Sequence, residues 1–297
     1  MPRVLLAPIS FGLGDLVLSL PALGALVAEG APVWLVARAA SQALLAERIP
    51  GLSGVTAEDR LVLGPGDRLI DLRDHPLQRD YWWGSPAFEA ALGPLGINEI
   101  LARICTDFGI HADFSRPVPL LARPRDGLRG TVLLVHGTDG PAKRWPDRHW
   151  AAVAEALRAD GHDVACVTKD EEPSPLGAFG VPAVALPTPG DVVDAFTACR
   201  GVIGIDTGLT HIAAQQGTPT VTVCRRSSVY FRRWPHCRVH RGGACTDVCT
   251  AAEARYAYND EVSLAHVHPS GWACPSGQPC MGDAAPAGAV ALLRELL

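Results

Sequence analysis

The sequence predicts an α/β protein built from two Rossmann-like, doubly wound domains that face each other across a cleft. Short apolar runs alternate with helical periodicity along most of the chain, as in a parallel sheet covered by helices. This pattern breaks at residues 120–130, where Pro and Gly stand among Arg and Asp, and then restarts, so we expect the interdomain linker there. Because 297 residues suit two domains of ordinary size, we expect domains at residues 1–124 and 125–297.

The elements of the first domain follow one another in a simple order. The run RVLLAPI predicts a buried strand, and a glycine-containing loop then leads into a helix over residues 15–29. Further strands are expected from PVWLVAR, LVL and RLIDLR, and a further helix from INEILARICTDFG.

The second domain repeats this alternation more clearly. Its expected strands are TVLLVHG, HDVACVTK, VPAVALP, GVIGID and TPTVTVC. Its expected helices are DRHWAAVAEALRADG, GDVVDAFTACR and LTHIAAQQG. The tail from Arg225 is rich in Arg, Cys, Gly and Pro, and we expect it to be irregular up to a short final helix over residues 287–297.

Composition excludes several classes of protein. A chain that is 48% hydrophobic and 19% charged is globular rather than disordered. The net charge of −5 gives no electrostatic basis for binding nucleic acid or an anionic membrane. The most apolar run, residues 16–28, is too short to be a transmembrane segment, and the N-terminus makes a poor signal peptide. We therefore expect a cytoplasmic protein with buried, reduced thiols at Cys105, Cys166, Cys199 and Cys224.

The stretch GIDTGLTH stands where a buried strand passes into a helix. The free N–H groups of a helix N-terminus attract anions, and Gly208 would let a phosphate approach the backbone. Thr207, Thr210 and His211 can add side-chain donors. The stretch therefore predicts a phosphate site. The simpler interpretation is that Asp206 or Thr207 only caps the helix.

The second stretch, HGTDGPAKRWPDRHW, joins a strand to the next helix. A glycine-containing loop with a lysine at a helix start suits a diphosphate. Lys143 is one of only two lysines among the 26 Lys and Arg residues of the chain, and a compact ammonium group makes a good point contact with phosphate. The competing interpretation is a solvated loop lysine.

The third stretch, SFGLGDLVLSL, contains Gly12 and Gly14 in a tight strand-to-helix turn, followed by Asp15. Asp15 could be a helix cap or a general base that accepts the proton of an incoming hydroxyl. The G-x-G pattern also suggests an NADP-dependent oxidoreductase that uses Arg38 after the second strand. Such an oxidoreductase would lack the third glycine of the dinucleotide fingerprint.

Together, GLGDLVLSLPAL, KRWPDRHWAAVAEAL and GIDTGLTHIAAQQGTPTV resemble the heptosyltransferase-type glycosyltransferases of family 9, and the resemblance covers about residues 3–225. It implies a GT-B fold with an acceptor-binding N-terminal domain and a C-terminal domain that binds a nucleoside diphosphate sugar, commonly ADP-heptose. It also implies an inverting transfer that requires neither a metal nor another cofactor for catalysis.

The resemblance also implies residue roles. Asp15 matches the catalytic base, Lys143 steadies the donor diphosphate and His211 can donate to the phosphates or the leaving group. Residues expected at the donor are Thr138, Asp139, Lys143, Glu171, Glu172, Asp206, Thr207, Gly208, Leu209 and His211. On the acceptor side we expect Gly12, Gly14, Trp82 and Trp83, although the two tryptophans could equally be core or lid residues.

Two features of the tail stand apart from these motifs. Cys245, Cys249, Cys274 and Cys280 form two close pairs that could hold a structural zinc or iron, or be unligated thiols or disulfides. The arginines between positions 225 and 241 form a basic run with interleaved aromatics. This run is either a solvated loop or a lip that meets an anionic acceptor or donor phosphate.

The sequence therefore predicts an enzyme that moves a sugar, in the first place heptose from ADP-heptose, to a hydroxyl acceptor. Lipopolysaccharide core, a natural product such as an aminoglycoside or nucleoside, and a protein all remain open as acceptors. Two competing functions are the NADP-dependent oxidoreductase and a catalytically inactive nucleotide-sugar-binding protein. The joint presence of Asp15, Lys143 and His211 argues against the inactive protein.

Overall fold

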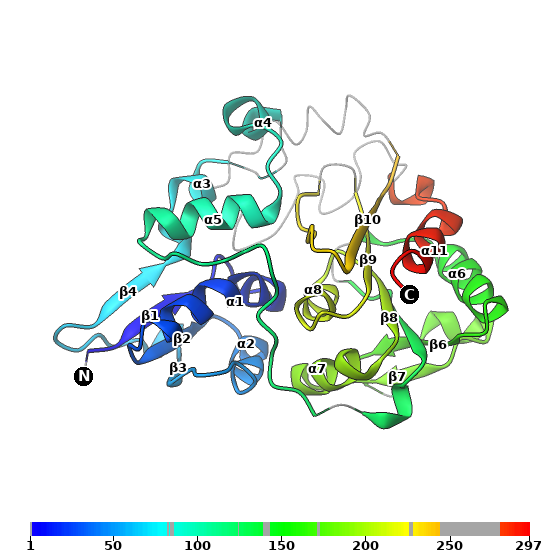
Figure 1. The fold of residues 1–297 in the computed structure, drawn as a ribbon, viewed down its shortest axis with the longest axis horizontal. Helices are drawn as coiled ribbons and strands as arrows, with labels where there is room; N and C mark the ends of the chain where they lie inside the picture. Colours follow the sequence, from blue (N-terminus) through cyan, green and yellow to red (C-terminus); the bar gives the residue numbers. More distant parts are fainter. Residues whose placement is uncertain are drawn as a thin grey trace.

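The computed structural model describes residues 2–81, 83, 86–123, 125–138, 143–170, 173–225, 228–243 and 280–297. Two all-parallel sheets with helices packed around them make up this part of the chain, so the predicted α/β class is confirmed (Figure 1). Each sheet is formed by one half of the chain, and the first ends before the linker region begins.

The N-terminal sheet has the strand order β3-β2-β1-β4. Its strands are β1 (Val4–Ala7), β2 (Val33–Ala37), β3 (Gly54–Ala57) and β4 (Arg68–Asp71). Its helices are α1 (Leu13–Ala28), α2 (Ala40–Ala46), α3 (Pro76–Arg79), α4 (Pro86–Leu92) and α5 (Ile97–Asp107). The central strand β1 is nearly fully buried, which explains its continuous apolar run.

One predicted strand of this half is wrong. The LVL run at residues 61–63 is not a strand; the edge strand is β3 instead. Val62 is 76% exposed, so this apolar run buries little surface and precedes a Gly-Pro-Gly turn. Gly54 opens β3 because the ring of Trp34 lies only 2.8 Å from where a Cβ would stand.

The C-terminal sheet has the strand order β10-β9-β8-β5-β6-β7. Its strands are β5 (Thr131–Val135), β6 (Asp163–Thr168), β7 (Ala183–Ala185), β8 (Gly201–Ile205), β9 (Thr220–Cys224) and β10 (Cys237–Arg241). Its helices are α6 (Asp147–Ala159), α7 (Pro189–Ala198), α8 (Gly208–Gln215) and α11 (Pro286–Arg294). The expectation of an irregular tail is wrong at β10, because CRVHR adds a half-exposed edge strand whose polar residues hide its pattern.

A single hydrophobic core runs through both halves. It includes Leu6 and Leu23 of the first half and Leu133, Phe196 and Ile212 of the second. In Figure 1, α1 and α8 lie side by side at the junction of the two sheets. A second core fills the opposite face of the C-terminal sheet.

The segment that joins the halves is tied to the C-terminal half by side-chain amides. Gln216 bonds the main chain of Leu120 twice, through Leu120 N at 2.7 Å and Leu120 O at 3.2 Å. The Gln215 amide donates to Val118 O at 3.0 Å. These bonds begin just before the predicted linker at residues 120–130. The boundary between residues 124 and 125 stays a prediction.

Two further expectations concern the chain as a whole. Within the described ranges, no helix combines the length and apolarity needed to cross a membrane. The four cysteines predicted to be buried thiols are buried in the structure, as is Cys237.

Candidate active site at two facing helix starts

The turn between β8 and α8 is shaped by local packing. Gly204 has no room for a side chain, because a Cβ there would lie 2.2 Å from Thr210 Oγ1. Thr210 in turn donates to Ile205 O at 2.6 Å, which closes the turn. Thr210 is therefore a structural residue. Asp206 and Thr207 are left between the end of the strand and the first residue of the helix.

The turn between β1 and α1 carries the second part of the site. Gly12 is the N-cap of α1 and has no side chain with which to cap it. Its N–H donates to Asp15 Oδ2 at 3.0 Å, so Asp15 closes the first turn of the helix from inside. Asp15 is thus not the N-cap, which is Gly12; its structural role is this bond within the first turn. It is compatible with a catalytic role, because the side chain remains half-buried rather than enclosed.

The N-termini of α1 and α8 are in close contact. A Cβ on Gly14 would lie 3.2 Å from His211 Cδ2 and 3.3 Å from Gly208 Cα. Two helix starts facing each other bring two partial positive charges together. Asp15 and Asp206 place carboxylates at these starts, and a bound anion would be attracted to the same place.

Asp206 is the centre of a buried polar cluster. Its Oδ2 lies 3.2 Å from Lys143 Nζ and accepts a hydrogen bond from Ser228 Oγ at 3.2 Å. Its Oδ1 lies 3.4 Å from His211 Nε2. Lys143 also donates to Asp206 O at 3.2 Å. Three segments that are distant in the sequence therefore converge on one carboxylate.

The charges of this cluster follow from its burial and partners. Burial would raise the pKa of Asp206, but the attraction of Lys143 and the contact with His211 outweigh it and hold this pKa below its usual range. Burial lowers the pKa of His211 more than Asp206 raises it, so the imidazole is neutral at neutral pH. The cluster is then an ammonium–carboxylate pair beside a neutral histidine.

Asp15 has the opposite perturbation. Burial raises its pKa to about 6, the largest opposing effects being the hydrogen bond from Gly12 and the charge of Lys143. The nearby negative charge of Asp206 raises it further. A carboxylate of this kind is ionised at neutral pH and basic enough to accept a proton from a hydroxyl.

A buried donor at the start of α8 lacks a partner. Within the described part of the chain, Oγ1 of Thr207 is buried and forms no hydrogen bond, and Thr207 makes no capping bond. A buried hydroxyl without a partner costs free energy, so it indicates a missing acceptor. A phosphate oxygen at the helix start would supply one.

The remaining predicted site residues have mixed outcomes. Thr138 is half-buried just beyond the end of β5, and Leu209 packs against the shared core. Asp139, Glu171, Glu172, Trp82, Cys245, Cys249 and Cys274 lie outside the described residues. Cys280 begins a short 3-10 turn, and its side chain is likewise outside the described part.

Trp83 is a core residue rather than an exposed platform for a sugar. It is 6% exposed, its Nε1 donates to Leu77 O at 2.8 Å, and its ring packs on that of Tyr230. This corrects its expected place at the acceptor in favour of the core interpretation, because the ring packs on Tyr230 and the indole N–H is already bonded to the main chain.

Two other residues bear on the choice between functions. Ser228, which no sequence motif singled out, is 5% exposed and bonds Asp206; only its position after β9, at the same sheet edge, could have indicated it. Arg38 is engaged elsewhere, with an ion pair to Glu58 and one to Asp71 at 2.7 Å. It is therefore not a free partner for a 2′-phosphate.

No group of three or more metal-ligating side chains gathers among the described residues. The site that these residues do form contains a pair of facing helix starts, a lysine, a histidine and two carboxylates. The polar residues of this site lie at the C-terminal ends of parallel strands, which is where doubly wound α/β folds bind their ligands.

The comparison with known families agrees with this architecture. The sequence model of glycosyltransferase family 9 (heptosyltransferase) matches residues 108–176 and 185–239. This match confirms the resemblance to that family noted in the sequence motifs.

Individual relatives are similar over shorter stretches or in fold alone. The chain is 36% identical over 95 residues to lipooligosaccharide heptosyltransferase 2 of Haemophilus influenzae, and this match spans 28% of each protein. Among solved structures, E. coli ADP-heptose lipopolysaccharide heptosyltransferase II is 20% identical with a TM-score of 0.60, over 100% of this chain and 98% of that one. The iron-containing dodecameric glycosyltransferase TibC of enterotoxigenic E. coli is 16% identical with a TM-score of 0.64, over 99% and 76%. At these identities the two structures are similar in fold.

Proposed function

We propose that the protein is an inverting glycosyltransferase that moves heptose from ADP-heptose to a hydroxyl group of an acceptor. The observation that carries the proposal is the contact between the two helix starts. It puts Asp15, a carboxylate with a raised pKa, next to the Lys143, Asp206 and His211 cluster. A general base for the acceptor hydroxyl thus lies beside hydrogen-bond donors that could hold a leaving diphosphate.

In the proposed reaction the acceptor oxygen attacks the anomeric carbon of the sugar. The bond from that carbon to the diphosphate breaks, and the diphosphate leaves with the bonding electrons. Asp15 accepts the hydroxyl proton as the new C–O bond forms. Attack from the face opposite the leaving group inverts the anomeric centre. The base and the leaving group must therefore lie on opposite sides of the sugar, and the two facing helix starts suit this requirement.

The negative charge that develops on the leaving diphosphate is the main feature to be stabilised. The N–H groups at the start of α8, the Thr207 hydroxyl and the Lys143 ammonium are suited to this task. Asp206 would orient Lys143 and His211 rather than contact the phosphate, because like charges repel. With these donors the transfer needs no metal ion.

The match to the family 9 (heptosyltransferase) model supports ADP-heptose as donor, and the lipooligosaccharide relative supports a lipopolysaccharide-core hydroxyl as acceptor. Glu171 and Glu172, which we expect to bind the ribose or the nucleobase of the donor, lie outside the described residues and give no further support. The NADP-dependent oxidoreductase is disfavoured because its expected phosphate ligand, Arg38, is paired with two carboxylates.

Calorimetric titration with ADP, UDP, GDP and NADP⁺ tests this proposal. We expect ADP to bind most tightly and Lys143→Met to weaken it by at least tenfold. The matched control is Arg148→Met, which removes an exposed cation at the start of α6. Equal ADP binding by wild type and Lys143→Met would contradict the assigned phosphate site. Preferential NADP⁺ binding would overturn the proposed function.

A further inference from the structure

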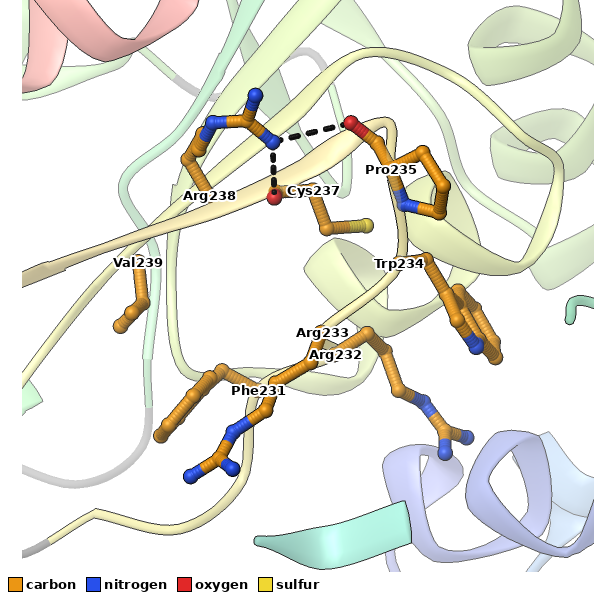
Figure 2. Close-up of a pocket in the computed structure, with 8 residues that line it drawn as sticks. All are labelled: Phe231, Arg232, Arg233, Trp234, Pro235, Cys237, Arg238 and Val239. Atoms are coloured by element: carbon orange, nitrogen blue, oxygen red, sulfur yellow. Dashed lines mark hydrogen bonds between the residues drawn. The ribbon is translucent and has the colours of Figure 1, made fainter. Parts of the chain in front are cut away.

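Arg232 is a buried cation in the basic run that follows β9. It is 3% exposed, so the solvated-loop interpretation is wrong for this residue, whereas Arg233 and Arg241 of the same run are exposed. Figure 2 shows that Arg232 and Trp234 point to one side of the segment, while Phe231 and Arg233 point to the other. The Arg232 guanidinium carbon lies 4.7 Å from the centre of the Trp234 ring. This segment also lines a pocket of about 440 Å³.

The guanidinium of Arg232 is only partly satisfied. Nη1 donates to Asn98 Oδ1 at 2.6 Å, but Nε and Nη2 are buried and have no hydrogen-bond partner in the part of the chain that the structure describes. The neighbouring arginines differ in this respect, since Arg233 pairs with Glu99 and Arg238 with Glu295. Burial lowers the pKa of Arg232 to about 9, so the group is still charged at neutral pH.

An unpaired buried charge is costly and indicates a missing partner. Nε and Nη2 form one edge of the planar guanidinium, and this edge matches a carboxylate or a phosphate with two parallel hydrogen bonds. The unpaired atoms therefore specify the chemistry of the partner as an oxyanion.

Arg232 lies between the two halves of the molecule. Asn98, its hydrogen-bond partner, is in the first turn of α5, and Trp234 Nε1 donates to Phe114 O at 3.0 Å. Arg232 is also close enough to His211 for its charge to lower the pKa of that imidazole. It thus approaches the reaction site from the side of the N-terminal half, whereas Lys143 approaches from between β5 and α6.

We propose that Arg232 binds an anionic group, a carboxylate or a phosphate, on the acceptor and so determines which acceptors are used. The proposal rests on the proposed transferase function. The donor diphosphate already has Lys143 and the start of α8, while Arg232 is fixed to the half assigned to the acceptor. An anion held there would place the acceptor hydroxyl relative to Asp15.

Inorganic phosphate is the probe for this subsite, titrated by calorimetry into protein saturated with ADP. We expect phosphate to bind wild type and to bind Arg232→Met at least tenfold more weakly. Arg233→Met is the matched control, because Arg233 is the neighbouring arginine with a 55% exposed side chain and a loose pair with Glu99. It should bind phosphate like wild type.

Equal phosphate binding by wild type and Arg232→Met overturns the proposal. Phosphate binding that depends on Arg232 but disappears when ADP is bound assigns the anion to the donor and overturns it as well. If ADP itself does not bind, the proposed function fails, and titration of the nucleotide-free protein still decides whether Arg232 binds an anion.

A second variant protects the test against misfolding of Arg232→Met. Asn98→Asp keeps the arginine and puts a carboxylate where the amide oxygen now accepts from Nη1. The internal ion pair should compete with an external anion, so we expect at least fivefold weaker phosphate binding with unchanged ADP binding. Wild-type phosphate affinity in a folded Asn98→Asp protein would contradict the proposal.

Discussion

Gly14 and Gly208 bring the backbones of α1 and α8 into direct contact. A Cβ on Gly208 would lie 2.8 Å from Gly14 N and 3.1 Å from Leu13 Cβ. Any larger residue would have to push the two helices apart, because the nearest atom belongs to the backbone rather than to a flexible side chain. The distance between Asp15 on one helix and the phosphate-binding N–H groups of the other therefore depends on the absence of a Cβ at Gly14 and Gly208.

We predict that Gly208→Ala separates the two helix starts and weakens both folding and function. Overpacking of this kind costs about 1–3 kcal/mol of unfolding free energy. ADP affinity should fall, because the first N–H groups of α8 shift. Urea unfolding and ADP titration measure the two effects.

Gly177→Ala is the control for the glycine substitution itself. Nothing lies within 4 Å of a Cβ at Gly177, and this glycine is also in a short helical turn. It should keep wild-type ADP affinity and lose no more than about 0.5 kcal/mol. If Gly208→Ala and Gly177→Ala had the same unfolding free energy and the same ADP affinity, close packing at Gly208 would not explain the effect of the substitution.

A second prediction concerns Asp15. Asp15→Asn should lower acceptor-dependent ADP release from ADP-heptose by about 10²–10⁴-fold, because the amide cannot accept a proton. ADP should still bind, since the donor contacts belong to α8 and Lys143. A variant that retained full transfer would remove Asp15 from the catalytic role and leave the fold unaffected.

The pH dependence of wild type provides an independent check on Asp15. Its pKa is raised to about 6 in the folded protein, so kcat/KM should rise with pH through about 6 and then level off. The raised pKa also means that ionisation of Asp15 opposes folding. The protonated Asp15 carboxyl instead favours the folded state. This contribution to stability is complete below the unfolded pKa of about 3.9 and is lost as pH rises through about 6. Asp15→Asn should therefore gain on the order of 1 kcal/mol over wild type at pH 7.5 and nothing near pH 4.

Regular elements were predictable because apolar runs were long and periodic. β8 and β9 are buried at every position, and their sequences show it directly. β3 and β10 were missed because an edge strand buries only part of its surface, so polar residues in GVTA and CRVHR remove the signal. The apolar LVL run misled for the opposite reason, since it is exposed next to a turn.

The site residues that could be predicted from the sequence lie at or near the start of a helix. Asp15, Lys143 and the DTG turn have recognisable local patterns, and the structure brings them together. The partnership of Ser228 with Asp206 and the burial of Arg232 were not predictable, because both depend on which loop folds over the sheet edge. Trp83 shows the limit of residue type alone, since an aromatic side chain suits a core as well as a sugar.

The pair of Lys143 and Asp206 leads to a third prediction. Lys143→Ala leaves a buried carboxylate with less compensation, so the unfolding free energy should fall by about 1–2 kcal/mol at pH 7. The depressed pKa of Asp206 stabilises the fold above its unfolded pKa, and this contribution is lost as pH falls. The loss of stability on acidification from about pH 5 to about pH 3 should therefore be smaller in Lys143→Ala than in wild type. Lys143→Arg keeps the charge and should show the wild-type dependence of unfolding free energy on pH. If all three proteins showed the same dependence, the Lys143–Asp206 pair would not be its cause.

The last prediction concerns the ion pair that joins the two halves away from the site. Arg48, just after α2, donates to both oxygens of Asp194 of α7 at 3.0 Å, and Asp194 also accepts from Arg123 N at 2.6 Å. Asp194 is 8% exposed, so Asp194→Asn leaves Arg48 without its charged partner and should cost about 2–4 kcal/mol in urea unfolding.

Asp126→Asn breaks an exposed pair with Arg129 and provides the matched comparison for Asp194→Asn. Those side chains are 84% and 76% exposed, so its cost should stay below about 0.5 kcal/mol. ADP affinity should survive in Asp194→Asn, because the phosphate donors belong to the C-terminal half alone. Transfer should fall, because it needs Asp15 of the other half at the correct distance. A parallel loss of ADP affinity would mean that the pair supports the C-terminal half itself rather than the arrangement of the two halves.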